Sequence, residues 1–239
     1  MSNIVIKNLN VRFEDMVIFD SFNIEFEENK INVILGSSGV GKTTILNCIA
    51  GILSYDGSIE GHDGGVSYIF QKDRLIPTIS IYKNLDLVLK TKIKDKKERK
   101  EKILKMLSLL EIEDCAKKYT TEMSGGQIQR AAIARAFLYP SNVILLDEPF
   151  KALDTSLKSK LIRVLLELHR EEQKTVIFVT HAIDECLLAA DNVYVFANNP
   201  VEIIYKTKIE KDAMERTLID PELDIIRKEL LSIVTKNAE

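Results

Sequence analysis

A glycine-rich segment that ends in Lys-Thr is the first feature that could do chemistry. Residues 36–44 read Gly-Ser-Ser-Gly-Val-Gly-Lys-Thr-Thr, follow the apolar run 31–35 and lead into a helix-compatible segment, 43–50. Glycines let the backbone curl so that successive N–H groups point at phosphate oxygens, and the N-terminus of the next helix adds partial positive charge. Lys42 could bind the β- and γ-phosphates of a nucleotide, and the hydroxyl of Thr43 could complete a magnesium site. The expected phosphate-binding residues are Gly36, Ser37, Ser38, Gly39, Val40, Gly41, Lys42, Thr43 and Thr44.

Two adjacent carboxylates form the second candidate group. Asp147 and Glu148 follow the apolar run 143–146 and precede Pro149. Fully apolar strands occur in buried parallel sheets, and ligands of such sheets bind at the carboxyl ends of the strands. We therefore expect Asp147 to hold magnesium beside the phosphates, directly or through water. An ordinary polar strand end is the alternative interpretation.

A third stretch, residues 124–127, reads Ser-Gly-Gly-Gln and precedes an Ala-rich run that ends at Phe137. Ser124 suits an N-cap, and the two glycines leave the first N–H groups of a helix uncovered, which makes a second anion-binding surface. Alone, this stretch could equally be a capped helix start. Together with the phosphate loop and the paired acids, it resembles the signature motif of the ATP-binding cassette (ABC) ATPases. The family usually has Leu where this chain has Met123, a volume-conserving apolar change.

The resemblance implies a paired assembly. In this family two chains join head to tail, and the signature of each contacts the γ-phosphate of the ATP held by the other chain's loop. Glu148 would polarise the attacking water, and such a general base contributes about 10²–10⁴-fold to the rate. The signature residues here are Ser124, Gly125, Gly126 and Gln127.

Three more residues take roles from the resemblance. Phe13 stands where the family has an aromatic ring, more often Tyr, that stacks on adenine, although it could simply pack in a strand pair. Gln71 stands where a Gln contacts magnesium and the attacking water, and without the resemblance it would be a solvated strand end. His181 stands where the switch His contacts the γ-phosphate, although a lone His at a strand end is more often structural. The expected metal site then comprises Thr43, Gln71 and Asp147.

Two further segments match the family less closely. Residues 152–154, with Asp154, match the D-loop, which crosses the dimer interface and links the two sites. The preceding residue is Lys151, where smaller residues such as Ser are more usual, and this leaves the local interface contact open. Residues 74–80 resemble the segment of ABC importers that receives a coupling helix of the permease, although its apolar residues could equally belong to the core.

The rest of the pattern predicts an α/β fold. Alternating apolar residues at 4–8 and 22–26 predict antiparallel strands, and apolar runs predict core strands at 66–70 and 176–180 and an edge strand at 193–196. Apolar residues at helical spacing predict helices between residues 72 and 140 and along 157–168. We therefore expect a P-loop NTPase core of the ABC ATPase type, with an antiparallel β edge and an inserted helical subdomain. The predicted catalytic core is 1–71 and 141–239, and the helical signature subdomain is 72–140.

Composition excludes several classes of protein. With 239 residues, 46% hydrophobic, 29% charged and a formal net charge of −3, the chain suits one catalytic module with no general attraction to nucleic acid. No apolar run approaches the roughly 18 residues that span a bilayer, and no signal peptide is present, so we expect a cytosolic chain. Cys48, Cys115 and Cys186 have no metal-binding spacing and indicate buried or neutral thiols. His62 and His169 match no motif and are expected at the surface.

These features predict the ATP-hydrolysing subunit of an ABC transporter, which acts as a dimer at the cytoplasmic face of the membrane. Its expected ligands are ATP and Mg²⁺, and its expected partners are a second ATPase subunit, permease subunits and an extracytoplasmic solute-binding protein. Residues 200–239 read as a short mixed-charge tail, whose Asp-Pro-Glu at 220–222 resembles the nitrate, sulfonate and taurine importer branch. An exporter or lipoprotein-extracting ATPase remains an alternative. A soluble ABC ATPase of DNA repair is disfavoured because the segment between loop and signature is too short for a long coiled coil.

Overall fold

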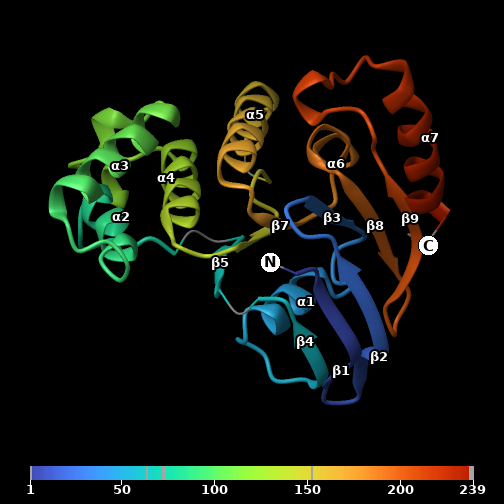
Figure 1. Ribbon diagram of the computed structural model, residues 1–239. Helices are drawn as coiled ribbons and strands as arrows, with labels where there is room; N and C mark the ends of the chain where they lie inside the picture. Colours follow the sequence, from blue (N-terminus) through green and yellow to red (C-terminus); the bar gives the residue numbers. More distant parts are fainter. Residues whose placement is uncertain (1, 63, 72–73, 152, 237–239) are drawn as a thin grey trace.

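A six-stranded sheet forms the centre of the molecule (Figure 1). The structure is a computed structural model that describes residues 2–62, 64–71, 74–151 and 153–236. All neighbouring strands of this sheet pair in parallel except the last two, which are antiparallel. Its order is β5 (Val66–Ile69), β6 (Val143–Asp147), β7 (Thr175–Thr180), β3 (Ile31–Leu35), β8 (Asn192–Ala197) and β9 (Glu202–Lys208).

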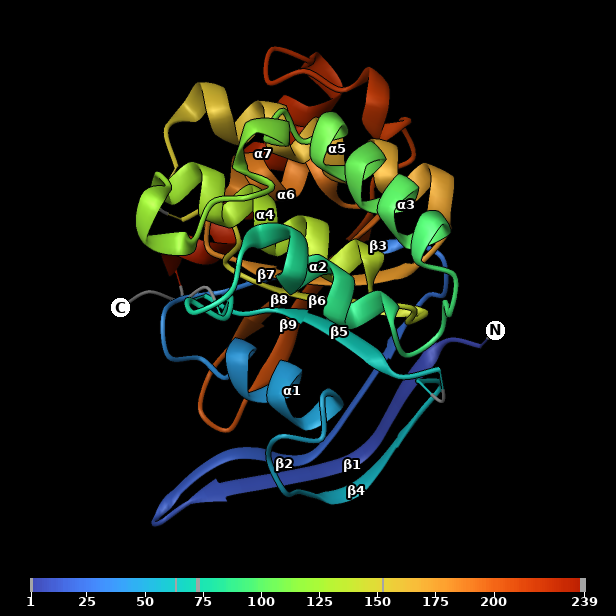
Figure 2. The same ribbon diagram turned by 90° about the vertical axis from the view of Figure 1, so that its left-hand side faces the viewer.

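A second, three-stranded sheet covers one face of the first. It consists of β2 (Met16–Phe26), β1 (Ile4–Phe13) and β4 (Asp56–Glu60), all antiparallel. The helix α1 (Lys42–Ile49) lies between the two sheets (Figure 2). The predicted antiparallel pairing is confirmed, but these strands form a sheet of their own and do not extend the central sheet.

The remaining helices cover the other face. In Figure 1, α4 (Gly125–Leu138), α5 (Thr155–Glu172), α6 (Ile183–Ala189) and α7 (Pro221–Lys236) follow one another across it, and neighbours in this row are in contact. The helices α2 (Ile81–Leu89) and α3 (Lys96–Leu109) pack on the outer side of α4. Among the described residues, none of these helices has the length and apolar character that crossing a bilayer requires.

Alternation along the central strands explains the layers. Val33 of β3, Leu146 of β6 and Phe178 of β7 join the core beneath the helices, whereas Ile34, Leu145 and Ile177 join the core around α1. Because successive side chains of a strand point to opposite faces, a run that is apolar at every position must be covered on both. The sheet is therefore held with its carboxyl edge fixed relative to α1.

Two expectations about the end of the chain are wrong. The segment 193–196 belongs to β8, which lies inside the sheet between β3 and β9 and not at its edge. The segment 200–236 is not a simple tail, because it contains β9 and α7, whose Leu223 and Leu230 are buried. The sequence gives no signal for β9 because this strand carries charges and is only partly buried. Its pairing with β8 is what defines it as a strand.

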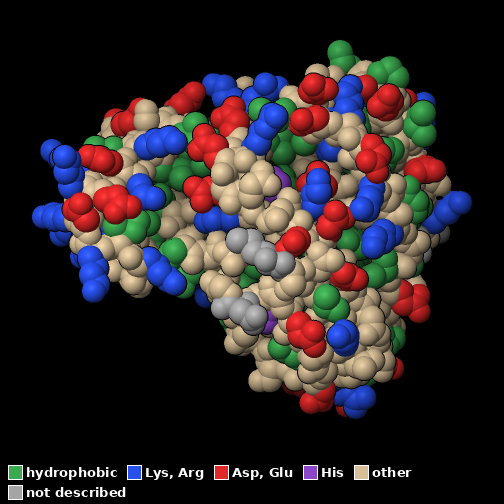
Figure 3. All heavy atoms as spheres, viewed as in Figure 1, with side chains coloured by type: hydrophobic (Ala, Val, Ile, Leu, Met, Phe, Trp, Pro, Cys, Tyr) green, Lys and Arg blue, Asp and Glu red, His purple; other side chains and the backbone are tan. Residues whose placement is uncertain are grey.

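Charged side chains of both signs are interspersed over the face shown in Figure 3. Lys and Arg side chains gather at the end where α2 and α3 lie, with Asp and Glu among them. This mixture is typical of solvated helix surfaces and shows no field of a single sign on this face.

Candidate functional site

The phosphate loop follows the carboxyl end of β3 and has the close backbone packing that glycine permits. A Cβ at Gly36 would lie 2.6 Å from the carbonyl oxygen of Phe196, so a larger residue would displace the loop. Gly41 precedes α1 with a φ of 107°, in the region that favours glycine. A Cβ on Gly41 would also approach Ile18 and Val201. The loop is thus seated on the strands that flank it, with its backbone free to face a ligand.

Lys42 places its ammonium inside this loop. The residue is only 5% exposed, and its Nζ donates hydrogen bonds to the carbonyl oxygens of Gly36 and Ser37, both at 2.8 Å. Burial lowers the pKa of Lys42, while the nearby carboxylates of Glu148 and Asp147 act in the opposite direction. A desolvated cation at the mouth of an anion-binding loop would gain from a phosphate in its place.

Thr43 and Asp147 meet beside the loop, although they come from α1 and β6. The Thr43 hydroxyl lies 3.0 Å and 3.1 Å from the two carboxylate oxygens of Asp147. Burial raises the pKa of Asp147, and the hydrogen bond from Thr43 opposes this shift. A hydroxyl and a carboxylate are the oxygen ligands that Mg²⁺ prefers, so these two residues fit the predicted metal.

Glu148 lies at the same edge in a fixed backbone position. It has a φ of 46°, and its N–H donates to the carbonyl oxygen of Val179 in β7 at 3.0 Å. One carboxylate oxygen, Oε1, is 3.2 Å from Nδ1 of His181, and the other, Oε2, is 2.7 Å from Nζ of Lys151. Burial alone would raise the pKa of Glu148, but these two partners outweigh it and hold that pKa below its usual value.

The signature residues form a capped helix start, as their sequence predicts. The Ser124 hydroxyl accepts a hydrogen bond from the Gln127 N–H at 3.3 Å, and the Gln127 side chain accepts one from the Ser124 N–H at 3.1 Å. A Cβ on Gly126 would lie 2.8 Å from Leu157 of α5, whereas Gly125 has open space around it. The cap thus uses the N–H groups of Ser124 and Gln127 and leaves those of Gly125 and Gly126 for a ligand.

The signature does not join the phosphate loop within one chain. In Figure 2 the central sheet lies between α1 and α4, and among the described residues no hydrogen bond connects the two motifs. The predicted site residues thus fall into two groups. Lys42, Thr43, Asp147, Glu148 and His181 are brought together, and the signature stands apart from them.

Three other predicted residues lie outside the contacts of the first group. Phe13 is 47% exposed at the end of β1, opposite Met16, in the hairpin whose strand β2 passes beside Gly41. Gln71 is exposed just after β5, and the described residues show no hydrogen bond from it to the other members of the site. Asp154 caps α5 by accepting a hydrogen bond from the Leu157 N–H at 3.0 Å. Ala152 of the predicted D-loop lies outside the described residues.

Sequence reasoning missed two features near the site. The contact of Lys151 with Glu148 was not predicted, although the two residues are one tight turn apart. The second feature is a stack of side chains from both sides of Gln71 in the sequence. The ring centres of Tyr68 and Phe70 lie 4.0 Å apart, and the Arg74 guanidinium lies 3.9 Å from the Phe70 ring centre. Two aromatic residues two positions apart, one on β5 and one directly after it, would have been the available signal, since alternate residues of an extended chain share one face.

The two remaining histidines are less exposed than predicted. His62 and His169 are both half-buried, and each has one buried ring nitrogen that finds no hydrogen-bond partner among the described residues. The expectation that they are surface residues is therefore wrong. Burial lowers the pKa of His169, with partial opposition from Asp191. The three cysteines are buried and free, as expected.

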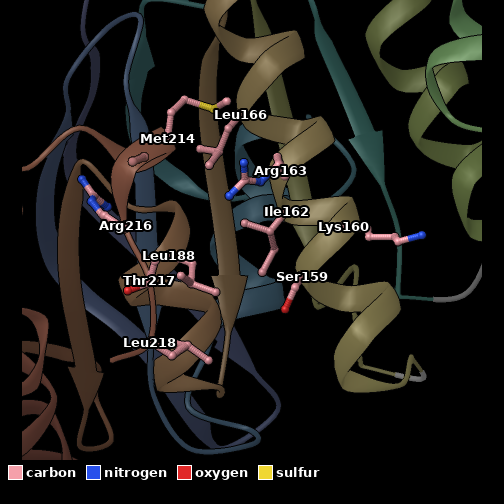
Figure 4. Close-up of a pocket in the computed structure, with 11 residues that line it drawn as sticks. Ser159, Lys160, Ile162, Arg163, Leu166, Leu188, Met214, Arg216, Thr217 and Leu218 are labelled. Carbon is pink, nitrogen blue, oxygen red and sulfur yellow. The ribbon is translucent and has the colours of Figure 1, made fainter. Parts of the chain in front are cut away.

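A separate cavity of about 410 Å³ lies between α5, α6 and the segment before α7 (Figure 4). In Figure 4, Arg163 points toward Met214 and Arg216, whereas Lys160 points away. Arg216 is buried and uses its N–H groups on main-chain carbonyls, among them those of Leu187 and Ala190. None of the residues that line this cavity belongs to the predicted site.

Comparisons with known proteins agree on one family. The sequence model of the family described as "ABC transporter" matches residues 19–151. The chain is 35% identical over 217 residues to the sulfate/thiosulfate import ATP-binding protein CysA of Mannheimia succiniciproducens, which covers 84% of this chain and 61% of that protein. It is 37% identical over 199 residues to the aliphatic sulfonates import ATP-binding protein SsuB of Bacillus cereus, covering 78% and 76% of the two chains.

Solved structures give the same result for the fold. The dimeric ABC transporter cassette MJ0796 superposes with a TM-score of 0.76 at 28% identity, over 87% of this chain and 99% of that one. The α/β fold predicted from the sequence is thereby confirmed. The chain spans less than two thirds of the length of the CysA relative.

Proposed function

Because the chain belongs to the ABC transporter family, we propose that it is the ATP-hydrolysing subunit of an ABC importer and acts as a dimer beneath a membrane permease. One observation carries the proposal: Lys42, Thr43, Asp147, Glu148 and His181 converge at the carboxyl edge of the central sheet. This arrangement offers a phosphate cradle, a magnesium site and a base in one place.

Each residue of the site has its own role in ATP hydrolysis. The loop N–H groups and Lys42 bind the β- and γ-phosphates, and Phe13 stacks on the adenine. Oxygen from water forms a bond to the γ-phosphorus, the water proton passes to Glu148, and the bond from the γ-phosphorus to the ADP oxygen breaks with its electron pair on ADP. His181 donates a hydrogen bond to the γ-phosphate. Magnesium held by Thr43, Asp147 and Gln71 would neutralise charge on the β- and γ-phosphate oxygens.

The position of the signature supports a head-to-tail dimer. The cap uses the N–H groups of Ser124 and Gln127, whereas the N–H groups of Gly125 and Gly126 make no hydrogen bond to the phosphate loop among the described residues. In the proposed dimer these groups complete the γ-phosphate site of the partner, with Asp154 near the interface. The dimeric cassette MJ0796, which shares this fold, supports the arrangement. Residues 72–140 would then move as a helical subdomain against the catalytic core, 1–71 and 141–239, when ATP closes the dimer.

The import direction and the solute class rest on the relatives. The two relatives described above are named as import ATP-binding proteins for sulfate or thiosulfate and for aliphatic sulfonates. We therefore place the chain at the cytoplasmic face of a membrane, bound to a permease that works with a solute-binding protein and takes up an oxyanion or a sulfonate. The nitrate and taurine members of this branch are the other candidate solute classes.

A pull-down tests this function. Tagged Glu148→Gln chain would be loaded with ATP and recovered from detergent-solubilised membranes of the native host, with Lys42→Met as the control that should not close on ATP. A permease recovered with a solute-binding protein is the expected result. A permease with a large extracytoplasmic domain and no binding protein would indicate an exporter, and recovery of no membrane protein would contradict a transport role.

A further inference from the structure

Lys151 folds back onto the residue proposed as the base. Its Nζ lies 2.7 Å from Oε2 of Glu148, three residues earlier. The side chain of Glu148 is 10% exposed and that of Lys151 is 47% exposed. The ion pair therefore has one partly desolvated member, which makes it stronger than the fully exposed pairs of this protein.

The backbone between the two residues fixes this contact. Lys151 donates its N–H to the carbonyl oxygen of Glu148 at 3.3 Å, which closes a turn. Phe150 within the turn is 1% exposed, and its ring packs edge to face on Phe178 of β7 at 5.7 Å. The Glu148 N–H is tied to β7 through Val179. Both ends of the ion pair thus start from anchored backbone, so little entropy is lost in forming it.

The two oxygens of the Glu148 carboxylate have different partners. Oε2 is buried and forms an ion pair with Lys151 that lacks hydrogen-bond geometry, and Oε1 faces His181 at 3.2 Å. A carboxylate held at one oxygen cannot rotate freely about its terminal torsion, which is otherwise broad. In the proposed function His181 contacts the γ-phosphate, which would release Oε1 while Oε2 stays on Lys151.

We propose that Lys151 is a positioning residue for ATP hydrolysis, which holds Oε2 of Glu148 so that Oε1 is the oxygen that takes the proton from the attacking water. This role rests on the proposed function of Glu148 as the base. A Ser at position 151, the smaller residue that the family more often has, could not reach Glu148 from the same backbone. The proton transfer itself is unchanged: the water proton goes to Oε1, and Lys151 neither gains nor loses a proton.

The test is the steady-state ATPase rate of the full chain with Lys151→Met, which keeps the length of the side chain and removes its charge. We expect kcat to fall about tenfold, a part of what a general base contributes, while KM for ATP changes by less than about twofold. Lys151→Arg, which keeps the charge, should restore most of the rate. The matched control is Lys228→Met, which removes an exposed ion pair of the same 2.7 Å length to Asp224 on α7 and should leave both constants unchanged.

A double-mutant cycle shows whether Lys151 acts through Glu148. In the Glu148→Gln background, adding Lys151→Met should change the single-turnover rate by less than about twofold, because the group that Lys151 positions is already gone. A similar drop in both backgrounds, a change in KM without one in kcat, or a Lys151→Met rate at or above the parent rate would overturn the proposal.

The same measurements separate the two proposals. If Glu148→Gln alone kept the parent rate, Glu148 would not be the base and the proposed mechanism would fail. If Glu148→Gln is inactive and Lys151→Met is not impaired, only the role of Lys151 fails.

Discussion

The hydroxyl of Thr43 lies 3.0 Å from one carboxylate oxygen of Asp147 and 3.1 Å from the other. These residues are 104 positions apart in the chain and meet because the helix α1 begins beside the carboxyl end of β6. Two kinds of oxygen ligand are thereby aligned at the edge of the phosphate loop. A hard cation placed here would contact both residues and the phosphates together.

Replacing Thr43 by Val should raise the magnesium requirement of hydrolysis. The change keeps the branched shape of the side chain and removes the one oxygen that it offers to the ion. We expect at least a roughly tenfold increase in the Mg²⁺ concentration for half-maximal ATPase activity, the order of effect seen when groups around a bound metal are removed. Thr91→Val, at an exposed hydroxyl after α2, is the control. An unchanged magnesium titration would remove Thr43 from the metal site.

Two buried lysines are expected to have different roles, one in ATP binding and the other in stability. Lys42 and Lys174 are 5% and 7% exposed, and each donates hydrogen bonds to two main-chain carbonyls. Only Lys42 lies in the phosphate loop. Lys42→Met should abolish measurable ATP binding in a fluorescence titration, because the charge that faces the phosphates is lost. Lys174→Met should lower Tm and leave ATP affinity unchanged, and equal losses of affinity in both variants would contradict this division.

The exposed ring of Phe13 is predicted to bind adenine. Phe13→Ala should weaken ATP binding by up to about 1–3 kcal/mol, the range measured for stacking of a base on an aromatic side chain. Phe13→Tyr should retain parent affinity, since the π-face is kept. Met16, the cross-strand neighbour of Phe13, is 54% exposed against 47% for Phe13, and Met16→Ala is the matched control. Equal affinity for the parent and Phe13→Ala would place the adenine elsewhere.

His169 should make the folded protein less stable as the pH falls below 6.5. Burial lowers its pKa below the usual 6.5, so the folded chain keeps His169 neutral while the unfolded chain takes up a proton as pH falls below that value. The contribution of neutral His169 to the stability of the folded state is complete above pH 6.5. It is lost as pH falls toward the depressed pKa that His169 has in the folded state. Tm measured from pH 7.5 to 5 should therefore decline less steeply for His169→Gln than for the parent. Parallel curves would show that His169 protonates equally in both states.

Prediction from sequence worked where one local pattern decided the structure. The apolar runs that became β3, β6 and β7 are buried at every position and could hardly be anything but interior strands. The turn-rich composition around β4 and the charges on β9 gave no such signal, because both strands are defined by the neighbours with which they pair.

The candidate site shows the same limit. The phosphate loop, the paired acids and the capped signature could each be read from a short stretch of sequence. The distance between Thr43 and Asp147, or between Glu148 and His181, depends on how the strands are ordered in the sheet. The sequence leaves the contact of Lys151 open because a single lysine after a turn carries no periodic signal, and only the folded turn directs it to Glu148.

In the proposed dimer, ATP joins two chains through the phosphate loop of one and the signature of the other. The direct measurement is the solution mass of Glu148→Gln with ATP, by light scattering, with and without the added change Ser124→Arg. We expect twice the 27.1 kDa of one chain for Glu148→Gln with ATP. We expect a single-chain mass when Ser124→Arg blocks the signature but ATP still binds. A dimer that forms without ATP, or that survives Ser124→Arg unchanged, would rule out this arrangement.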